Sequence, residues 1–229
     1  MSSVTLQRVS RTFPGMDHPA VDQVDLDVAD GELVVLQGPT ASGKSMLLRL
    51  IAGVERPDRG LVCIDGVDVT SMPADERGVA MVYQSYALYP HMTVAENLAH
   101  HLKVDRVPRA EAMERVAAIA ELLGIADVLE ERPARLTAGQ RQRVAMGRGI
   151  VRRPRVLLMD EPLGNLEPRL RPPAQELLVQ LHELLGLTTV LATRDLASAE
   201  AIADRVATLE RGALVDCVAP KGASIRRSD

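Results

Sequence analysis

The sequence predicts an α/β fold, with a largely parallel sheet in the core and a helical segment inserted into it. Short apolar segments rich in Val alternate with helical patterns along the chain, and strands buried on both faces in this way are typical of parallel sheets. A glycine-rich loop at 38–45 joins an apolar segment to a helical one. Between about residues 88 and 155 little strand pattern is found, which indicates an inserted helical subdomain.

The expected elements follow in order along the chain, with apolar runs or alternation predicting strands and helical spacing predicting helices. Strands are expected at 3–9, 21–28, 33–37 and 79–83, with a helix at 46–52. Helices are expected at 109–123 and 139–151, and strands resume at 156–159, 188–192 and 205–210. The predicted division is a core of about 1–87 and 156–216, a helical subdomain of about 88–155, and a disordered tail, 217–229.

The composition agrees with a globular domain. Of the 229 residues, 46% are hydrophobic and 25% are charged, which allows a sizeable core. The net charge of −4 gives no indication of nucleic-acid binding. The N-terminus lacks a signal-peptide pattern, and no window approaches the ~20 apolar residues that span a bilayer. A role at a membrane would therefore depend on partner subunits.

The cysteines and histidines are interpreted as packing or surface residues. Cys63 and Cys217 have no metal or disulfide spacing, so we expect both to be reduced. His91, His100 and His101 lack a cysteine partner and a regular helical spacing, so we expect no metal site there.

The loop at 38–45 has the composition of a phosphate-binding loop. Its backbone N–H groups and the positive end of the following helix can cradle phosphate oxygens. We expect Lys44 to contact the β- and γ-phosphates of a nucleotide and the Ser45 hydroxyl to bind Mg²⁺. The loop residues are Gly38, Pro39, Thr40, Ala41, Ser42, Gly43, Lys44 and Ser45.

Two carboxylates end the apolar strand at 156–159. Asp160 stands at the carboxyl end of the strand, where ligands bind in parallel sheets, and is a candidate Mg²⁺ ligand. Glu161 can act as a general base that polarises an attacking water. The alternative is that the two acids only begin a surface loop.

A third motif, Leu136-Thr137-Ala138-Gly139-Gln140, precedes a basic helix that leads to the acid-terminated strand. The phosphate loop, this signature and the acidic strand, in that order, resemble the ATP-binding subunits of ABC transporters over about residues 3–216. The resemblance implies a RecA-like P-loop ABC ATPase core with ATP and Mg²⁺ as ligands. It also implies a dimer, in which the loop of one subunit and the 136–140 segment of the other enclose two ATP molecules.

The same resemblance assigns further site residues. Gln84 would reach Mg²⁺ and the attacking water, the Phe13 ring would stack on adenine, and Met46 would lie at the α-phosphate. On chemistry alone, Gln84 could equally be a surface residue and Phe13 an ordinary residue at a strand end. The residues facing the ATP of the partner subunit would be Thr137, Ala138, Gly139 and Gln140.

Residues 83–94 closely resemble one segment of the ATPases of carbohydrate and glycerol-phosphate importers. In that family the segment lines a groove that receives a coupling helix of the membrane subunit. All three tyrosines, Tyr83, Tyr86 and Tyr89, lie here, as expected of an amphipathic docking surface. The resemblance implies membrane permease subunits as partners and a place in the cytoplasm, peripheral at the inner face of the cell membrane.

Several positions depart from the family pattern. Ala41 stands where the family usually has glycine, and a positive φ there would cost ~1–2 kcal/mol. Met46 replaces a threonine, and Ala138 replaces the first of two glycines. Residues 164–167 lack the usual serine and aspartate at their ends. Pro172-Pro173 fall inside what is normally a continuous helix, which we expect them to break or kink.

The largest departure is Arg194, where the family has a histidine that is hydrogen-bonded to the γ-phosphate and the catalytic glutamate. Arginine keeps the positive charge and the donors but accepts no hydrogen bond. We expect Arg194 to be a third catalytic-site residue beside Glu161 and Gln84. Its predicted salt bridge to Glu161 would disable that carboxylate as a base.

The sequence thus predicts the ATP-binding subunit that powers an ABC importer, for solutes of carbohydrate or glycerol-phosphate type. The alternative is an ATP-binding subunit with impaired hydrolysis and a dimerising or regulatory role, which Arg194 and Ala138 favour and Glu161 opposes. A soluble ABC-type protein acting on DNA or ribosomes is a third, which the 83–94 segment opposes. Because the chain stops soon after Val215-Asp216, we expect no C-terminal regulatory domain of the sugar-importer kind.

Overall fold

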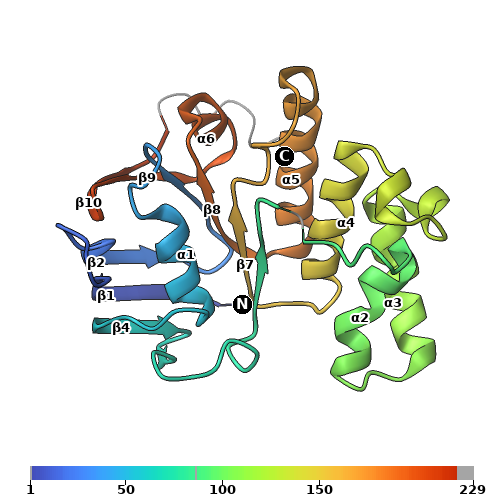
Figure 1. The fold of residues 1–229 in the computed structure, drawn as a ribbon, viewed down its shortest axis with the longest axis horizontal. Helices are drawn as coiled ribbons and strands as arrows, with labels where there is room; N and C mark the ends of the chain where they lie inside the picture. Colours follow the sequence, from blue (N-terminus) through green and yellow to red (C-terminus); the bar gives the residue numbers. More distant parts are fainter. Residues whose placement is uncertain (1, 86, 221–229) are drawn as a thin grey trace.

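The central sheet holds six strands in the order β10-β9-β3-β8-β7-β6 in a computed structural model that describes residues 2–85 and 87–220. The strands from β9 to β6 are parallel, and only β10 is antiparallel to its neighbour. The predicted largely parallel sheet is therefore confirmed (Figure 1). In chain order its strands are β3 (Leu33–Gln37), β6 (Val79–Val82), β7 (Val156–Asp160), β8 (Thr188–Thr193), β9 (Arg205–Glu210) and β10 (Ala213–Val218).

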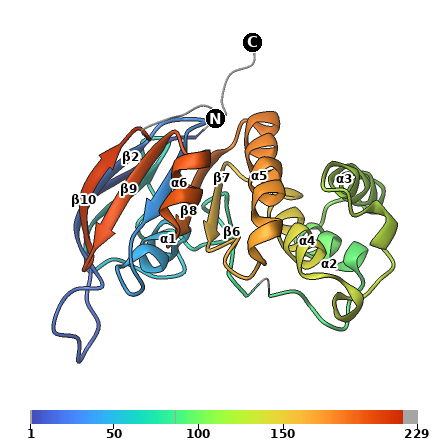
Figure 2. The same cartoon turned by 90° about the horizontal axis from the view of Figure 1, so that it is seen from above.

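Both faces of this sheet are buried, because side chains on successive strand residues point to opposite faces. Along β3, Leu33 and Val35 pack into one hydrophobic cluster, while Val34 and Leu36 pack into another. Helices α5 (Arg171–Leu185) and α6 (Leu196–Ile202) cover the first face, and α1 (Lys44–Ala52) covers the second (Figure 2). This double burial explains the continuous apolar runs in the sequence.

A second, antiparallel sheet lies on the far side of α1 and was not predicted as a separate sheet. Its order is β2-β1-β4-β5, formed by β1 (Val4–Arg11), β2 (Val21–Val28), β4 (Arg59–Ile64) and β5 (Val67–Asp68). Strand β2 alternates buried Val and Leu with more exposed Asp and Gln, as a sheet with only one covered face requires. The sequence pattern predicted β1 and β2 but not β4 and β5, and only tertiary pairing assigns the four strands to a separate sheet.

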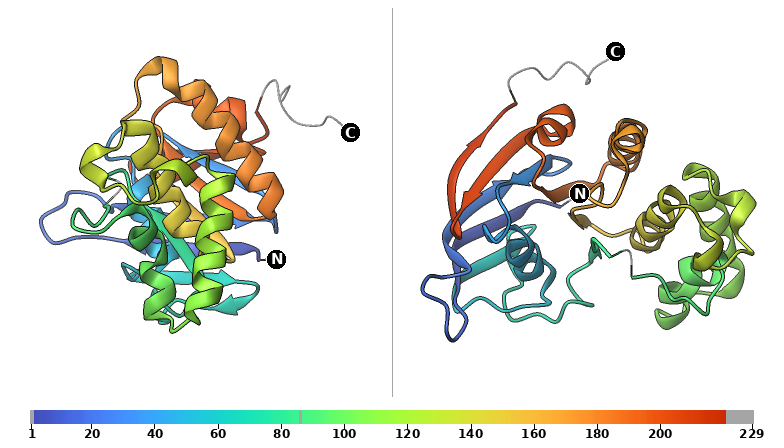
Figure 3. Two further views of the ribbon diagram at one scale, coloured as in Figure 1. Left: turned by 90° about the vertical axis from the view of Figure 1, so that its right-hand side faces the viewer. Right: turned by 45° about the horizontal axis from the view of Figure 1, so that its top comes forward.

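The helical part consists of α2 (Val94–Val104), α3 (Arg109–Leu122) and α4 (Ala138–Ile150), with short 3-10 turns at Ala126–Val128 and Pro133–Arg135. These helices gather on one side of the molecule, joined to the core after β6 and before β7 (Figure 3). They pack closely at Gly147 of α4, where an added Cβ would lie 2.7–3.1 Å from the side chains of Leu98, Ile119 and Leu123. The predicted helices at 109–123 and 139–151 are confirmed in place and in type.

The expected break at Pro172-Pro173 is wrong. A 3-10 turn at Pro168–Leu170 leads into α5, which begins at Arg171, so both prolines lie in its first turn. The N–H groups of a first turn have no partner within the helix, and the fixed φ of proline suits this position. The proline pair therefore marks the start of α5 and leaves its interior uninterrupted.

Near the C-terminus, the expected start of a disordered tail at 217 is also wrong, because Cys217 and Val218 complete β10. Residues 221–229 of that expectation, and Tyr86 of the docking segment, lie outside the described residues. Both cysteines are free thiols: Cys63 is buried in β4, and the Cys217 sulfur accepts a hydrogen bond from Arg205.

Candidate functional site

The candidate site lies at one edge of the central sheet, where the carboxyl ends of parallel strands meet. The loop after β3 contains residues 38–43, and β7 ends at Asp160, with Glu161 next. Strand β8 leads to Arg194, and β6 is followed closely by Gln84. The parallel topology thus gathers four segments that lie far apart in the sequence.

The backbone of the 38–45 loop passes too close to other chain segments for side chains at two positions. A Cβ on Gly38 (φ 155°) would lie 2.2 Å from the Leu209 carbonyl oxygen, and one on Gly43 (φ 105°) would lie 2.5 Å from that of Ala20. Only glycine fits such positions. Ala41 has φ 62°, so the predicted positive φ at this non-glycine residue is confirmed.

Lys44 is folded back into this loop. Its side chain is 5% exposed, and Nζ donates to the carbonyl oxygens of Gly38 (2.6 Å) and Pro39 (2.8 Å) and to the Ser42 hydroxyl (3.2 Å). Burial lowers the pKa of Lys44, although the nearby carboxylates of Glu161 and Asp160 oppose that shift. The three oxygens that the Lys44 ammonium binds are thus all uncharged, and the oxygens of an anion such as phosphate can replace them.

Oxygen atoms suited to a divalent cation lie beside Lys44. The Ser45 hydroxyl donates to Oδ1 of Asp160 over 2.9 Å, and Asp160 is 7% exposed. A hydroxyl and a buried carboxylate are ligands of the type that Mg²⁺ prefers. The residues present therefore fit this ion. Helix α1 begins at Lys44 without a side-chain cap at Gly43, which leaves its first N–H groups available to phosphate.

Glu161 is held from two sides. Its backbone has φ 47°, and its N–H donates to the Ala192 carbonyl of β8. Its Oε1 accepts from Nε of Arg194 over 3.1 Å, with side-chain exposures of 11% for Glu161 and 53% for Arg194. The predicted salt bridge between these two residues is confirmed.

The other carboxylate near Arg194 already has partners. Asp195 caps α6, accepting from the Ser198 hydroxyl (2.7 Å) and from the backbone N–H groups of Ala197 and Ser198. These bonds, the Ser198 hydroxyl first, lower the pKa of Asp195. A cavity of about 250 Å³ between Glu161 and Asp195 is also lined by Arg171, Arg194 and Thr193.

Gln84 and Phe13 lie at two borders of the site. Gln84 is exposed, and its carbonyl accepts from the Asn165 side chain over 2.7 Å. The side-chain Nε2 of Gln84 lies 3.7 Å from where a Cβ on Gly164 would be, and that position is 3.3 Å from the carbonyl oxygen of Glu161. Phe13 lines a cavity of about 300 Å³ with residues 41–46 of the loop and Arg49. The structure thus brings Phe13, Met46 and the phosphate loop to one cavity.

Residues 137–140 lie elsewhere. Thr137 and Gln140 form a capping box at the start of α4, with each side chain accepting from the backbone N–H of the other. Helix α4 is separated from α1 by β6 and β7 (Figure 2). A single chain therefore does not bring this segment to its own phosphate loop.

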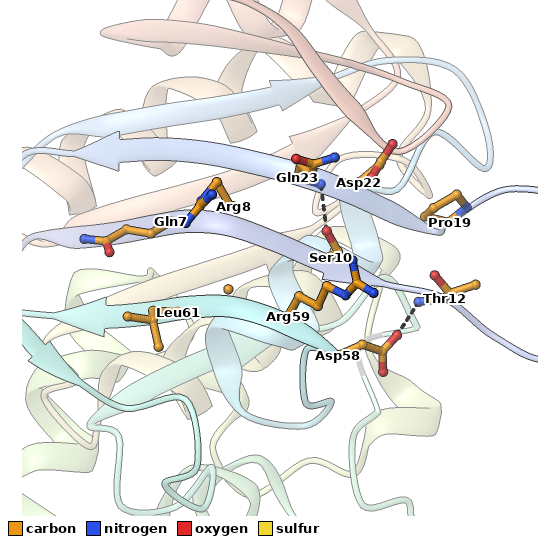
Figure 4. A pocket seen from close by; sticks show the side chains of 11 residues that line it. Gln7, Arg8, Ser10, Thr12, Pro19, Asp22, Gln23, Asp58, Arg59 and Leu61 are labelled. Atoms are coloured by element: carbon orange, nitrogen blue, oxygen red, sulfur yellow. Dashed lines mark hydrogen bonds between the residues drawn. The ribbon is translucent and has the colours of Figure 1, made fainter.

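Two features were missed by sequence reasoning. The Arg11 guanidinium lies 4.7 Å from the centre of the Phe13 ring and binds Asp58, which is 47 residues away. No local pattern reports such a pair. A cavity of about 740 Å³ lies over β1, β2 and β4, where Gln23 N–H donates to Ser10 and Thr12 N–H to Asp58 (Figure 4). Its lining includes neither residues 38–45 nor Asp160 and Glu161.

Comparison with known proteins agrees with this geometry. The family model described as "ABC transporter" matches residues 21–164. A diacetylchitobiose uptake system ATP-binding protein of Streptomyces coelicolor is 46% identical over 96% of this chain and 58% of its own length. An sn-glycerol-3-phosphate import ATP-binding protein of Paraburkholderia xenovorans is 46% identical over 93% of this chain and 58% of its own.

A solved dimeric ATP-binding cassette with ADP and phosphate bound has a TM-score of 0.85 at 28% identity, covering 96% of this chain and 99% of its own. The chain spans about 58% of the length of the two curated relatives. The expected absence of a C-terminal regulatory domain stays a prediction. In the part of the chain that the structure describes, no helix is both long and apolar enough to cross a membrane. The sequence match and the shared architecture together show that the chain belongs to the ABC transporter family, among its ATP-binding proteins.

Proposed function

We propose that this chain is the ATP-binding subunit that powers an ABC importer, by ATP-driven dimer closure followed by hydrolysis. The observation that carries the proposal is the meeting of Lys44, Ser45, Asp160 and Glu161 at one sheet edge. The names of the relatives favour a carbohydrate or glycerol-phosphate type of solute.

In this proposal the loop amides and Lys44 bind the phosphates of ATP. Lys44 would exchange its bonds to neutral carbonyl oxygens for bonds to phosphate, in which the acceptor is charged as well as the donor. Ser45 and Asp160 would hold Mg²⁺, and Gln84, which follows β6, would be a further ligand. The ion would supply neutralisation of the phosphate charge. Phe13 and Met46 border the cavity next to this loop, where the base and α-phosphate would lie.

Glu161 is the proposed general base, accepting the proton of the attacking water at a carboxylate oxygen. The test is Glu161→Gln, which removes proton acceptance but keeps the shape of the side chain. We expect Mg-ATP binding by calorimetry to be retained and phosphate release to fall to background. Hydrolysis at the wild-type rate in this variant would reject the assigned base.

The second subunit would complete the site. Residues 137–140 lie away from the loop of their own chain, and they begin a helix. The capping box uses the N–H groups of Thr137 and Gln140, so those of Ala138 and Gly139 would face the phosphates of a partner. The solved relative is a dimer. We therefore propose two ATP molecules between two cassettes, which are two copies of this chain or this chain and a related one.

The 83–94 segment is the proposed docking surface for permease subunits, placing the chain at the cytoplasmic face of the cell membrane. Asn97 fixes this segment, because its side-chain amide donates to the carbonyl groups of Tyr89, Met92 and Thr93. Ala87 is exposed, with φ 42°, a conformation that Asp tolerates.

Ala87→Asp should therefore prevent co-purification with permease subunits, sought first among those encoded beside this chain, while ATP binding is unchanged. A charge placed in such an interface goes unpaired. Met113→Asp, on the exposed face of α3, is the matched control. Undiminished co-purification of Ala87→Asp would reject the docking surface.

The Arg194–Glu161 ion pair favours a second candidate function, an ATP-binding subunit with impaired hydrolysis and a dimerising or regulatory role. Binding and dimer closure would then be the working steps. The rate of Arg194→His, considered in the Discussion, separates the two functions.

A further inference from the structure

The end of β1 and the loop after it contain a stacked pair, Arg11 and Phe13, at the border of the candidate nucleotide cavity. We propose that Arg11 is a positioning residue for nucleotide binding: it supports the Phe13 ring on one face and so fixes the other face as a platform for the base. This inference rests on the proposed function and adds to it a residue outside every motif of the sequence.

Arg11 is itself firmly held. Nη1 binds Oδ1 of Asp58 over 2.6 Å, and Nη2 lies 3.4 Å from Oε2 of Glu55. The Arg11 side chain is 25% exposed, and its guanidinium carbon is 4.7 Å from the centre of the Phe13 ring. Two carboxylates thus orient the guanidinium plane, and a cation at this distance from an aromatic face attracts it.

Asp58 also fixes the backbone next to the ring. Its second oxygen, Oδ2, accepts from the Thr12 N–H over 2.7 Å, and this bond is the main cause of the lowered pKa of Asp58. One carboxylate therefore binds both the side chain of Arg11 and the backbone of Thr12. Phe13 follows directly, with its carbonyl accepting from the Met16 N–H.

The platform is tied to the phosphate loop through Ala20. The Ala20 N–H donates to the Arg11 carbonyl over 2.8 Å, and the Ala20 carbonyl oxygen lies where a Cβ on Gly43 would clash. The ring and the loop border the same cavity. Both the height of the ring above the loop and its tilt are therefore set before any nucleotide binds, which lowers the entropy cost of binding a base.

The ligand class that uses such a platform is a nucleoside triphosphate, because inorganic tripolyphosphate has no base to stack. Calorimetric titration with Mg²⁺ and either ATP or tripolyphosphate separates the two parts of the site. We expect Arg11→Met to weaken ATP binding about fivefold to tenfold and to change tripolyphosphate binding less than about twofold. Arg11→Lys, which keeps the charge without the plane, should fall between.

A double-substitution cycle tests whether Arg11 acts through Phe13. Phe13→Ala removes the platform, so Arg11→Met added to it should weaken ATP binding less than about twofold further. Arg8→Met, on the exposed face of the same strand, is the charge-matched control and should change neither ligand. Thermal unfolding of each variant monitors folding, and Asp58→Asn, which removes the anchor, should reproduce the ATP-selective loss if Arg11→Met does not fold.

Two results would overturn the inference. Equal weakening of ATP and tripolyphosphate would mean that Arg11 acts by its charge on the phosphates. An undiminished effect of Arg11→Met in the Phe13→Ala background would mean that Arg11 does not act through the ring. If the wild type bound neither ligand, the proposed nucleotide site itself would fall, and this inference with it.

Discussion

Lys44 and Arg194 are two cations that follow neighbouring strands, β3 and β8, yet the structure holds them in different ways. Lys44 is buried, and its three partners are uncharged oxygens. Arg194 is half-exposed, and its partner is the carboxylate of Glu161. An incoming phosphate can take Lys44 from carbonyl groups without breaking an ion pair. To take Arg194 it must compete with Glu161.

The difference separates binding from hydrolysis. The loop around Lys44 is formed in advance for an anion, whereas the carboxylate proposed to accept a proton is already paired to a cation. Single substitutions measure how much each cation contributes to ATP binding and to the rate of hydrolysis.

Removing the first cation should have the largest effect. Lys44→Ala should weaken Mg-ATP binding about 100-fold, because a charge-assisted contact is lost in a partly desolvated site. Calorimetry checks this, with the exposed Lys103→Ala as the control that keeps wild-type affinity. Equal affinity in the wild type and Lys44→Ala would contradict the assignment of the phosphate loop.

Replacing the second cation should raise turnover. Arg194→His should increase the steady-state ATPase rate about 10-fold, if freeing and orienting Glu161 lowers the barrier by ~1.4 kcal/mol. Arg109→His, at the exposed start of α3, is the control. Ala138→Gly should add a smaller gain, visible only in dimers. A lower rate in Arg194→His would show instead that Arg194 stabilises the developing phosphoryl charge, as an arginine finger does.

Strain in the loop gives a smaller effect. Ala41 has φ 62°, so Ala41→Gly should increase the free energy of unfolding by about 1 kcal/mol, measured in urea. Ala117→Gly, at an exposed position inside α3, should lower it by about the same amount. A destabilised Ala41→Gly would mean that the entropy of the unfolded chain outweighs the relief of strain.

The smallest effect concerns Asp195, whose carboxylate caps α6. Its pKa is lowered in the fold, mainly by Ser198. Its contribution to stability is therefore present above the unfolded pKa and is lost as the pH falls through the folded pKa. Ser198→Ala should raise that folded pKa and move acid unfolding, followed by circular dichroism, to higher pH. Ser71→Ala, at an exposed turn, should leave the transition in place.

The strands and helices at 21–28, 33–37, 109–123 and 205–210 could be predicted because hydrophobic periodicity is a local property of the chain. The phosphate loop could be predicted for a similar reason, since its residue types and its strand–loop–helix context are contiguous. The break predicted at Pro172-Pro173 was wrong, because the effect of a proline depends on its distance from the start of the helix. A proline fits the first turn of a helix but interrupts its interior. In the structure, α5 begins directly after the 3-10 turn at Pro168–Leu170.

The sequence by itself determined the chemistry available to the site: a lysine and a serine after glycine, two carboxylates after a strand, and an arginine in place of a histidine. Only the tertiary structure decided which of these groups meet. Arg194 reaches Glu161 because β8 pairs with β7, which brings the residues that follow the two strands together. Arg11 reaches Phe13 because Asp58, directly before β4, lies beside the end of β1, with which β4 pairs. Such contacts join residues tens of positions apart, and their geometry depends on strand register, which no local pattern of residues specifies.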